Sequence, residues 1–174
     1  MTRGSRAHTA TIRGFPPVAR RGARVLLLGS MPSVASLAAG EYYAHPHNQF
    51  WRIIGELLAI NPAAPYAKRT AALRRADVAL WDVLASCTRP GSLDTDIDER
   101  SIVVNPFADF LAVHPHIRRV CFNGARAEAA WRRHVLPLLP RDRELDCLRL
   151  PSTSPAHAAL TFRQKLRAWR ALLD

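Results

Sequence analysis

The sequence has few cysteines and no long hydrophobic run, and each shortage excludes a class of protein. Its three cysteines, Cys87, Cys121 and Cys147, lie far apart and form no C-x-x-C pair, which argues against a structural zinc or iron–sulfur site. No apolar stretch approaches the roughly 20 residues that a membrane-spanning helix requires. An odd number of cysteines without a secretion signal fits a reducing compartment. We therefore expect a cytoplasmic protein that binds no metal and does not enter a membrane.

Motifs that would identify several common enzyme classes are also missing. Residues 29–33 (GSMPS) lack the glycine spacing and the lysine of a phosphate-binding loop, and there is no dinucleotide-binding fingerprint. The G-x-S-x-G turn of serine hydrolases is absent, which disfavours ester hydrolysis by Ser152 with His157. His45 and His47 have no third ligand nearby, which disfavours a metal site. No cofactor is implied.

Acidic residues are scarce relative to basic ones. The 174 residues include 25 Lys+Arg and 14 Asp+Glu, which gives a formal net charge of +11. Nearly all the basic residues are arginine, which a GC-rich genome would also favour, but codon bias does not explain the low acid count. Since 48% of the residues are hydrophobic, the chain can form a core. It is a candidate binder of nucleic acid or another polyanion.

The order of apolar runs and turns predicts alternating strands and helices. We expect buried strands at 25–28, 78–83, 119–122 and 145–150. We expect helices at 33–39, 49–59, 67–75, 106–113, 125–136 and 161–173, with Asn105 capping the fourth of them. This alternation predicts an α/β fold, a three-layer α/β/α sandwich with a central, mostly parallel four-stranded sheet. Residues 1–10 are expected to form a flexible basic arm and residues 11–174 a single domain.

Polar or small residues follow all four expected strands. The loops are GSMPS (29–33), a polar loop at 85–100, FNG (122–124) and PSTSPAH (151–157). Because the carboxyl ends of parallel strands meet at one edge of a sheet, and ligands bind there, these loops predict a site. Asp82, near the end of the second strand, is expected to anchor a loop in preference to activating water.

The side chains in and beside these loops suit a nucleobase pocket. Tyr42, Tyr43 and Phe50 offer flat rings for stacking. Asn48 and Asn123 offer amides that can donate to and accept from a base edge. PSTSPAH offers hydroxyl and backbone N–H groups to a phosphate, and the arginine-rich surface supplies long-range attraction. Each residue also has a purely structural explanation, because the rings can pack in the core and the asparagines can cap a helix or form a turn.

At these residues the chain resembles the uracil-DNA glycosylase superfamily, and within it the hypoxanthine (deoxyinosine) DNA glycosylases. The resemblance rests on GSMPS, on YYAHPHNQFW (42–51) and on PSTSPAH, so it covers most of the chain. It implies an enzyme that hydrolyses the N-glycosidic bond of a deaminated base in DNA, for base excision repair, without a cofactor. Since no side-chain amine is placed as a nucleophile, we expect a monofunctional enzyme that does not cut the strand, and we expect a monomer.

The resemblance also implies roles for individual residues. Asn48, in the HPxN run, corresponds to the catalytic asparagine of that branch. The implied base-binding residues are Tyr43, Ser30, Met31, Phe50 and Asn123. The implied contacts with the DNA backbone are Ser152, Thr153, Ser154 and His157.

Two positions depart from the family pattern. Mismatch-specific members hold the attacking water with an asparagine in the first motif, where this chain has Met31, which hydrogen-bonds water poorly. Many relatives have H-P-S in the second motif, where Leu150 replaces the histidine here, and His157 is the candidate substitute. Two alternatives therefore stay open: a uracil-DNA glycosylase on the same scaffold, and a non-catalytic nucleic-acid-binding module.

Overall fold

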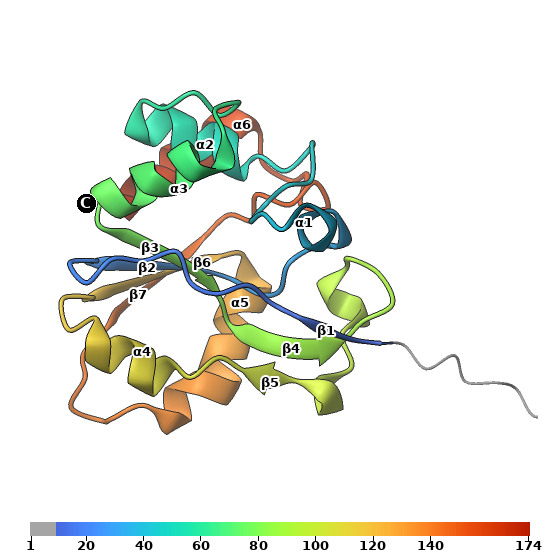
Figure 1. The fold of residues 1–174 in the computed structure, drawn as a ribbon, viewed down its shortest axis with the longest axis vertical. Coiled ribbons are helices and arrows are strands. Elements are labelled where there is room, and N and C mark those ends of the chain that lie inside the picture. The colour runs from blue at the N-terminus through green and yellow to red at the C-terminus, as the bar shows by residue number, and fades with distance from the viewer. Residues whose placement is uncertain (1–9) are drawn as a thin grey trace, which may run out of the picture.

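The computed structural model describes residues 10–174 and has a four-stranded parallel sheet at its centre (Figure 1). The strands are β2 (Val25–Gly29), β3 (Val78–Asp82), β6 (Arg119–Asn123) and β7 (Asp146–Leu150), in the order β3-β2-β6-β7. All three neighbouring pairs are parallel. Leu26, Leu27 and Leu28 in β2 are fully buried, as expected of a strand covered on both faces. The predicted parallel sheet is confirmed.

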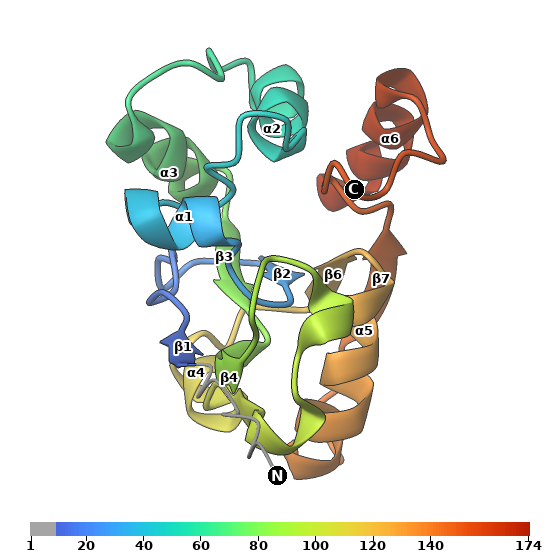
Figure 2. The ribbon, with the colours of Figure 1, turned by 90° about the vertical axis from the view of Figure 1, so that its right-hand side faces the viewer.

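Helices cover both faces of this sheet, which makes the three predicted layers (Figure 2). One face carries α1 (Val34–Ala39), α2 (Phe50–Leu58), α3 (Tyr66–Arg75) and α6 (Phe162–Trp169). The other carries α4 (Phe107–Val113) and α5 (Ala125–Ala130), which continues as a π-helical turn, Trp131–Val135, and a 3₁₀ helix, Leu136–Leu138. A last 3₁₀ helix, Arg170–Leu172, follows α6.

The helices α2 and α6 meet through large apolar side chains. Phe50, Ile53 and Ile54 of α2 are fully buried, while Arg52 points to solvent. The ring of Trp169 in α6 meets Phe50 edge to face, with 5.9 Å between centroids. This contact holds the segment before α2 next to the loop before α6, so it sets the spacing of two of the motifs.

A small antiparallel sheet was not foreseen in the sequence. It consists of β1 (Thr11–Arg13), β4 (Leu84–Thr88) and β5 (Val103–Val104), in the order β1-β4-β5. The expectation of a loop at 85–100 is therefore wrong for residues 85–88, which form most of β4. Two 3₁₀ helices, Asp94–Asp96 and Glu99–Ser101, lie in the remainder.

Asn105 does not cap α4, contrary to expectation. Pro106 stands at the cap position, and the Asn105 side-chain amide instead donates to the backbone carbonyl of Asp82, at 2.8 Å. The backbone N–H of Asn105 donates to the carbonyl of Val83, at 3.0 Å. Asn105 therefore fixes the chain where it leaves β3.

Residues 10–174 contain no helix that is both long and apolar enough to cross a bilayer. Apart from Ala10, the basic arm expected at 1–10 lies outside the described residues. That residues 11–174 act as one domain stays a prediction.

Truncation of a side chain in β2 tests the position of the core. Leu27 is fully buried, so we expect Leu27→Ala to lower the free energy of unfolding by about 2–5 kcal/mol, measured by urea denaturation. Leu138→Ala is the matched control, because Leu138 is 68% exposed and its loss should cost less than about 0.5 kcal/mol. Equal losses for the two variants would contradict the placement of Leu27.

Candidate active site

A cavity of about 100 Å³ lies at the carboxyl ends of the central strands, where the sequence predicts a site. Segments far apart in the chain line it: Gly29, Ser30, Met31, Pro32, Ser33 and Ser36; Tyr42, Tyr43 and Asn48; Asp82, Ser92 and Asp94; Asn123; Ser152, Thr153 and Ser154. Most predicted site residues are thus brought together. Phe50 and His157 are not among them.

Gly29, the last residue of β2, allows two polar groups to approach the strand. A Cβ at this position would collide with the Oδ1 atom of Asp82 and stand 2.7 Å from the hydroxyl oxygen of Tyr43. Only glycine leaves room for both. The close approach brings a carboxyl group and a phenol over the same stretch of backbone.

Tyr43 lines the cavity in a strained conformation. Its φ angle is 56°, in the left-handed region that bulky residues rarely adopt. One face of its ring stacks on Phe50, with 3.9 Å between centroids and 17° between planes. Its hydroxyl group is buried near the Asn123 amide, and burial raises its pKa although Asn123 opposes the shift. The ring is held firmly at the cavity wall.

Phe50 supports the Tyr43 ring by stacking against one of its faces. It is fully buried on the inner face of α2, where its edge also meets Trp51 and Trp169. The structure therefore corrects the expectation that Phe50 contacts a base: its ring is inaccessible because Tyr43 and the α2 core cover it.

Asn48 lines the cavity just before α2, whose cap position is Gln49. Its Oδ1 atom accepts a hydrogen bond from the backbone N–H of Phe50, at 3.0 Å, and its own backbone N–H donates to the carbonyl of His45, at 2.9 Å. Nothing within residues 10–174 accepts a hydrogen bond from its Nδ2 group. The bond to Phe50 orients the side chain and leaves an amide donor for a ligand.

Asn123 ties the end of β6 to the PSTSPAH loop. Its Nδ2 group donates to the Thr153 hydroxyl and its Oδ1 atom accepts from the Thr153 backbone N–H, both at 2.9 Å. Thr153 is fully buried. The structure therefore corrects the expectation that Thr153 contacts the DNA backbone, because its hydroxyl group is buried against Asn123. Asn123 keeps one N–H and one lone pair for a ligand.

Asp82 is a site residue that sequence reasoning undervalued. Its side chain lines the cavity and is almost fully buried, and its Oδ2 atom has no hydrogen-bond partner among the described residues. Only its backbone carbonyl takes part in anchoring, through Asn105. Burial, then repulsion from Asp94, raises the pKa of Asp82 to about 8, although Arg89 opposes the shift. The carboxyl group is therefore mostly neutral at pH 7 and can donate a hydrogen bond.

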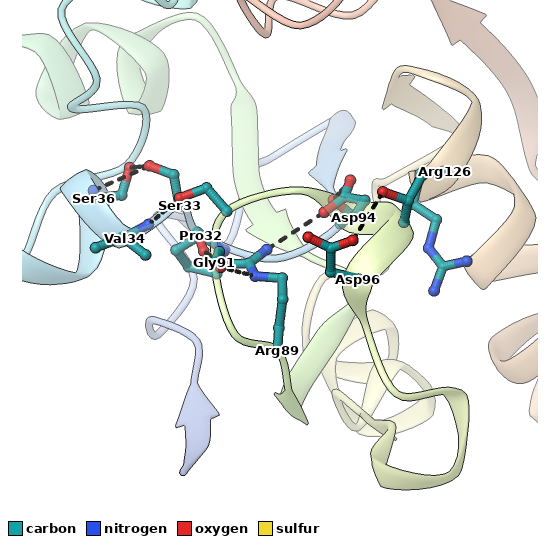
Figure 3. Close-up of polar contacts among 12 residues, drawn as sticks. Pro32, Ser33, Val34, Ser36, Arg89, Gly91, Asp94, Asp96 and Arg126 are labelled. Atoms are coloured by element: carbon teal, nitrogen blue, oxygen red, sulfur yellow. Dashed lines mark hydrogen bonds and ion pairs between the residues drawn. The ribbon is translucent and has the colours of Figure 1, made fainter. Parts of the chain in front are cut away.

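A buried arginine fastens the loop that closes this side of the cavity (Figure 3). Arg89 donates through Nε to the carbonyl of Gly91, at 2.6 Å, and through Nη2 to the carbonyl of Pro32. Its Nη1 atom lies 3.5 Å from Oδ1 of Asp94, whose Oδ2 accepts from the Ser30 hydroxyl at 2.5 Å. The sequence did not indicate the buried structural role of Arg89 or any role of Asp94, because a polar loop with a proline and a glycine is ordinarily exposed. Met31, 7% exposed, lies in the segment fastened this way.

A more open cleft of about 420 Å³ adjoins the cavity and shares Asn48 and Ser154 with it. Arg52, His157 and Lys165 also line this cleft. The Nζ group of Lys165 donates to the backbone carbonyl of His157, at 2.7 Å, while the His157 side chain is exposed. His157 therefore belongs to the rim and not to the smaller cavity.

Metal binding has no constellation of ligands in the described part of the chain. Residues 10–174 contain no group of three or more His, Cys, Asp or Glu side chains that could hold an ion. The rings of His45 and His47 are 5.7 Å apart, and Nδ1 of His45 accepts from the backbone N–H of His47.

Replacement of the ionisable Asp82 side chain should change how the stability of the fold depends on pH. Folding raises the pKa of this carboxyl from 3.8 to about 8, so the folded protein keeps a proton that the unfolded chain releases. Asp82 therefore destabilises the fold progressively as pH rises from about 4 through about 8. We expect Asp82→Asn to raise the melting temperature more at about pH 9 than at about pH 4.5. A constant difference between variant and wild type would show that Asp82 ionises normally.

Comparison with known proteins agrees with the geometry. Residues 16–173 match the family model of the uracil DNA glycosylase superfamily. Two similar proteins are hypoxanthine DNA glycosylases from Methanosarcina acetivorans and Methanosarcina barkeri, 37% and 36% identical over 116 residues, which are 66% of this chain and 72% of each relative.

A similar solved structure is the solution NMR structure of a Methanosarcina acetivorans protein described as a candidate uracil DNA glycosylase. It is 31% identical, has a TM-score of 0.76, and the match covers 95% of this chain and 100% of that one. The resemblance first seen in the three motifs is confirmed, and the chain belongs to the uracil DNA glycosylase superfamily.

Proposed function

We propose that this protein is a monofunctional DNA glycosylase that removes a deaminated base, with hypoxanthine in deoxyinosine as its first substrate. The observation that carries the proposal is the cavity at the strand ends, where the Asn48 amide, the Tyr43 ring and the Asn123 amide converge. The relatives named hypoxanthine DNA glycosylases support the choice of base. A monomer in the cytoplasm is the expected form.

Cleavage of an N-glycosidic bond leaves positive charge on the sugar and negative charge on the departing base. An enzyme lowers the barrier by fixing a water molecule beside C1′ and by directing hydrogen-bond donors at the base. Asn48 suits either task, since the hydrogen bond from the Phe50 N–H orients its amide before substrate binds. Tyr43 would stack on the base, and Asn123 would contact its edge.

A base reaches this cavity only after it leaves the DNA helix. Unstacking costs a few kcal/mol, and less where the base is mispaired, as inosine opposite thymine is. Ser152 and Ser154 at the cavity mouth, with His157 at its rim, would hold the backbone beside the flipped nucleotide. Arg52 and the overall charge of +11 would supply attraction to phosphates.

Uracil is the second candidate base. The similar solved structure is that of a protein described as a candidate uracil DNA glycosylase, which keeps uracil in consideration. Uracil and hypoxanthine share an N–H group next to an oxo group, so the same amides can address both. Parallel assays on duplexes that carry deoxyinosine, deoxyuridine or deoxyxanthosine would rank the bases.

The central test is strand cleavage by hot alkali after incubation with a duplex that carries deoxyinosine opposite thymine. We expect cleavage with the wild type and a rate lower by about 10²-fold or more with Asn48→Ala. Asn61→Ala is the matched control: Asn61 makes the same kind of local bond, from Oδ1 to the Ala63 N–H at 2.9 Å, but is exposed and does not line the cavity.

The outcomes separate the hypotheses. Equal rates for the Asn48 and Asn61 variants would keep the glycosylase and remove Asn48 from its chemistry. DNA binding by the wild type without an abasic product from any of the three duplexes would leave a binding module in place of an enzyme.

A further inference from the structure

The floor of the cavity holds a polar group that the protein leaves without a partner. Asp82 Oδ2 is buried and has no hydrogen bond within residues 10–174, and the buried Tyr43 hydroxyl near it has the Asn123 amide as a polar neighbour. The Asp82 and Tyr43 side chains lie over the bare backbone of Gly29 and line the cavity. A buried polar group without a protein partner is costly, so the Asp82 carboxyl group is suited to pair with a polar atom of a ligand.

We propose that the neutral carboxyl group of Asp82 donates a hydrogen bond to the oxo group of the flipped base and stabilises the negative charge that this base acquires as it leaves. The inference rests on the proposed function, and it assigns to Asp82 a part in the chemistry alongside Asn48.

The surroundings of Asp82 keep its side chain free for this task. The Asn105 amide binds the backbone carbonyl and not the carboxyl group. Arg89, the cation that acts on this carboxyl group, is hydrogen-bonded to Gly91, Pro32 and Asp94. Ionisation would leave a charge on a buried oxygen, Oδ2, that accepts no hydrogen bond from the described residues, whereas the neutral carboxyl group can offer its O–H group to an acceptor.

Of the charged groups that face Asp82, Arg89 favours the ionised form, but it offsets the opposing effects only in part. Asp94 repels the carboxylate and Arg89 attracts it, both from the loop after β4. Tyr42 and Tyr43 face it from the segment before α2, with phenols whose pKa burial raises, so both stay neutral. Burial is the largest influence and raises the pKa of Asp82 to about 8.

The step balances without a proton transfer to or from Asp82. The C1′–N bond breaks and its electron pair stays on the base, while the oxygen of water forms the new bond to C1′. The proton that the water loses neutralises the departing base. The Asp82 O–H group remains covalently intact and only shortens the hydrogen bond as charge grows on the oxo group.

The decisive measurement is the pH profile of the single-turnover rate on the deoxyinosine duplex. We expect the wild-type rate to fall about tenfold per pH unit above about pH 8, as Asp82 loses its proton. Asp82→Asn keeps an N–H donor but cannot ionise, so its rate should lie within about tenfold of wild type at about pH 7 and lack that fall. Ionisation of the base itself would affect both proteins equally and is removed by the comparison.

Two further variants sharpen the test. Asp82→Leu keeps a similar volume without a donor, and we expect a rate lower by about 10²-fold or more at every pH. Asp109→Asn, an exposed aspartate in the first turn of α4, makes the same chemical change away from the cavity and should match the wild-type profile. Thermal unfolding confirms that each variant is folded; if Asp82→Leu is not, the profile of Asp82→Asn still decides.

The results distinguish failure of this inference from failure of the proposed function. A wild-type protein that cleaves no deoxyinosine or deoxyuridine duplex overturns the function itself. Cleavage in which Asp82→Asn retains the wild-type fall above pH 8, or in which a folded Asp82→Leu keeps the wild-type rate, overturns only the role of Asp82.

Discussion

The absence of a side chain at Gly29 is the constraint on which the site depends. Gly29 stands at the carboxyl end of the central strand β2, where β3 and β6 also end. Any larger residue would displace the Asp82 carboxyl and the Tyr43 hydroxyl. The parallel sheet thus supplies the location of the site, and one missing Cβ supplies the room in which its polar groups meet.

Around this floor, polar contacts between protein groups hold the walls of the cavity in place without a ligand. Arg89 ties the loop at 91–94 to Pro32, and Asn123 ties β6 to Thr153. Each contact joins segments that are at least 30 residues apart, so each fixes the cavity against the freedom of long loops. A buried guanidinium is tolerated here because backbone carbonyls and Asp94 satisfy it. The cavity is therefore preorganised, which lowers the cost of binding.

The sequence predicts what depends on local pattern and misses what depends on pairing. The runs at 25–28 and 120–122 are apolar and are followed by glycine or asparagine, so their strands can be predicted. Strand β4 is not, because Ala85, Ser86 and Thr88 are small or polar and become a strand only by pairing with β1 and β5.

Within the site the same division holds. Residue type alone indicated the amides of Asn48 and Asn123 and the ring of Tyr43. It could not show that Phe50 faces inward or that Thr153 is buried, since the direction of a side chain depends on packing. Nor could it show that the Asp82 carboxyl has no partner, which only the complete set of neighbours reveals.

The polar groups on the cavity floor also link the selection of the substrate to base flipping. A hydrogen bond made by such a group contributes about 0.5–1.5 kcal/mol. A ligand gains that free energy only when its own polar atoms reach the cavity floor over Gly29. A base that stays stacked in DNA gains nothing from them, whereas a flipped base does. Since unstacking costs a few kcal/mol, hydrogen bonds from Asp82 and Tyr43 to the flipped base are of the right size to offset part of that cost.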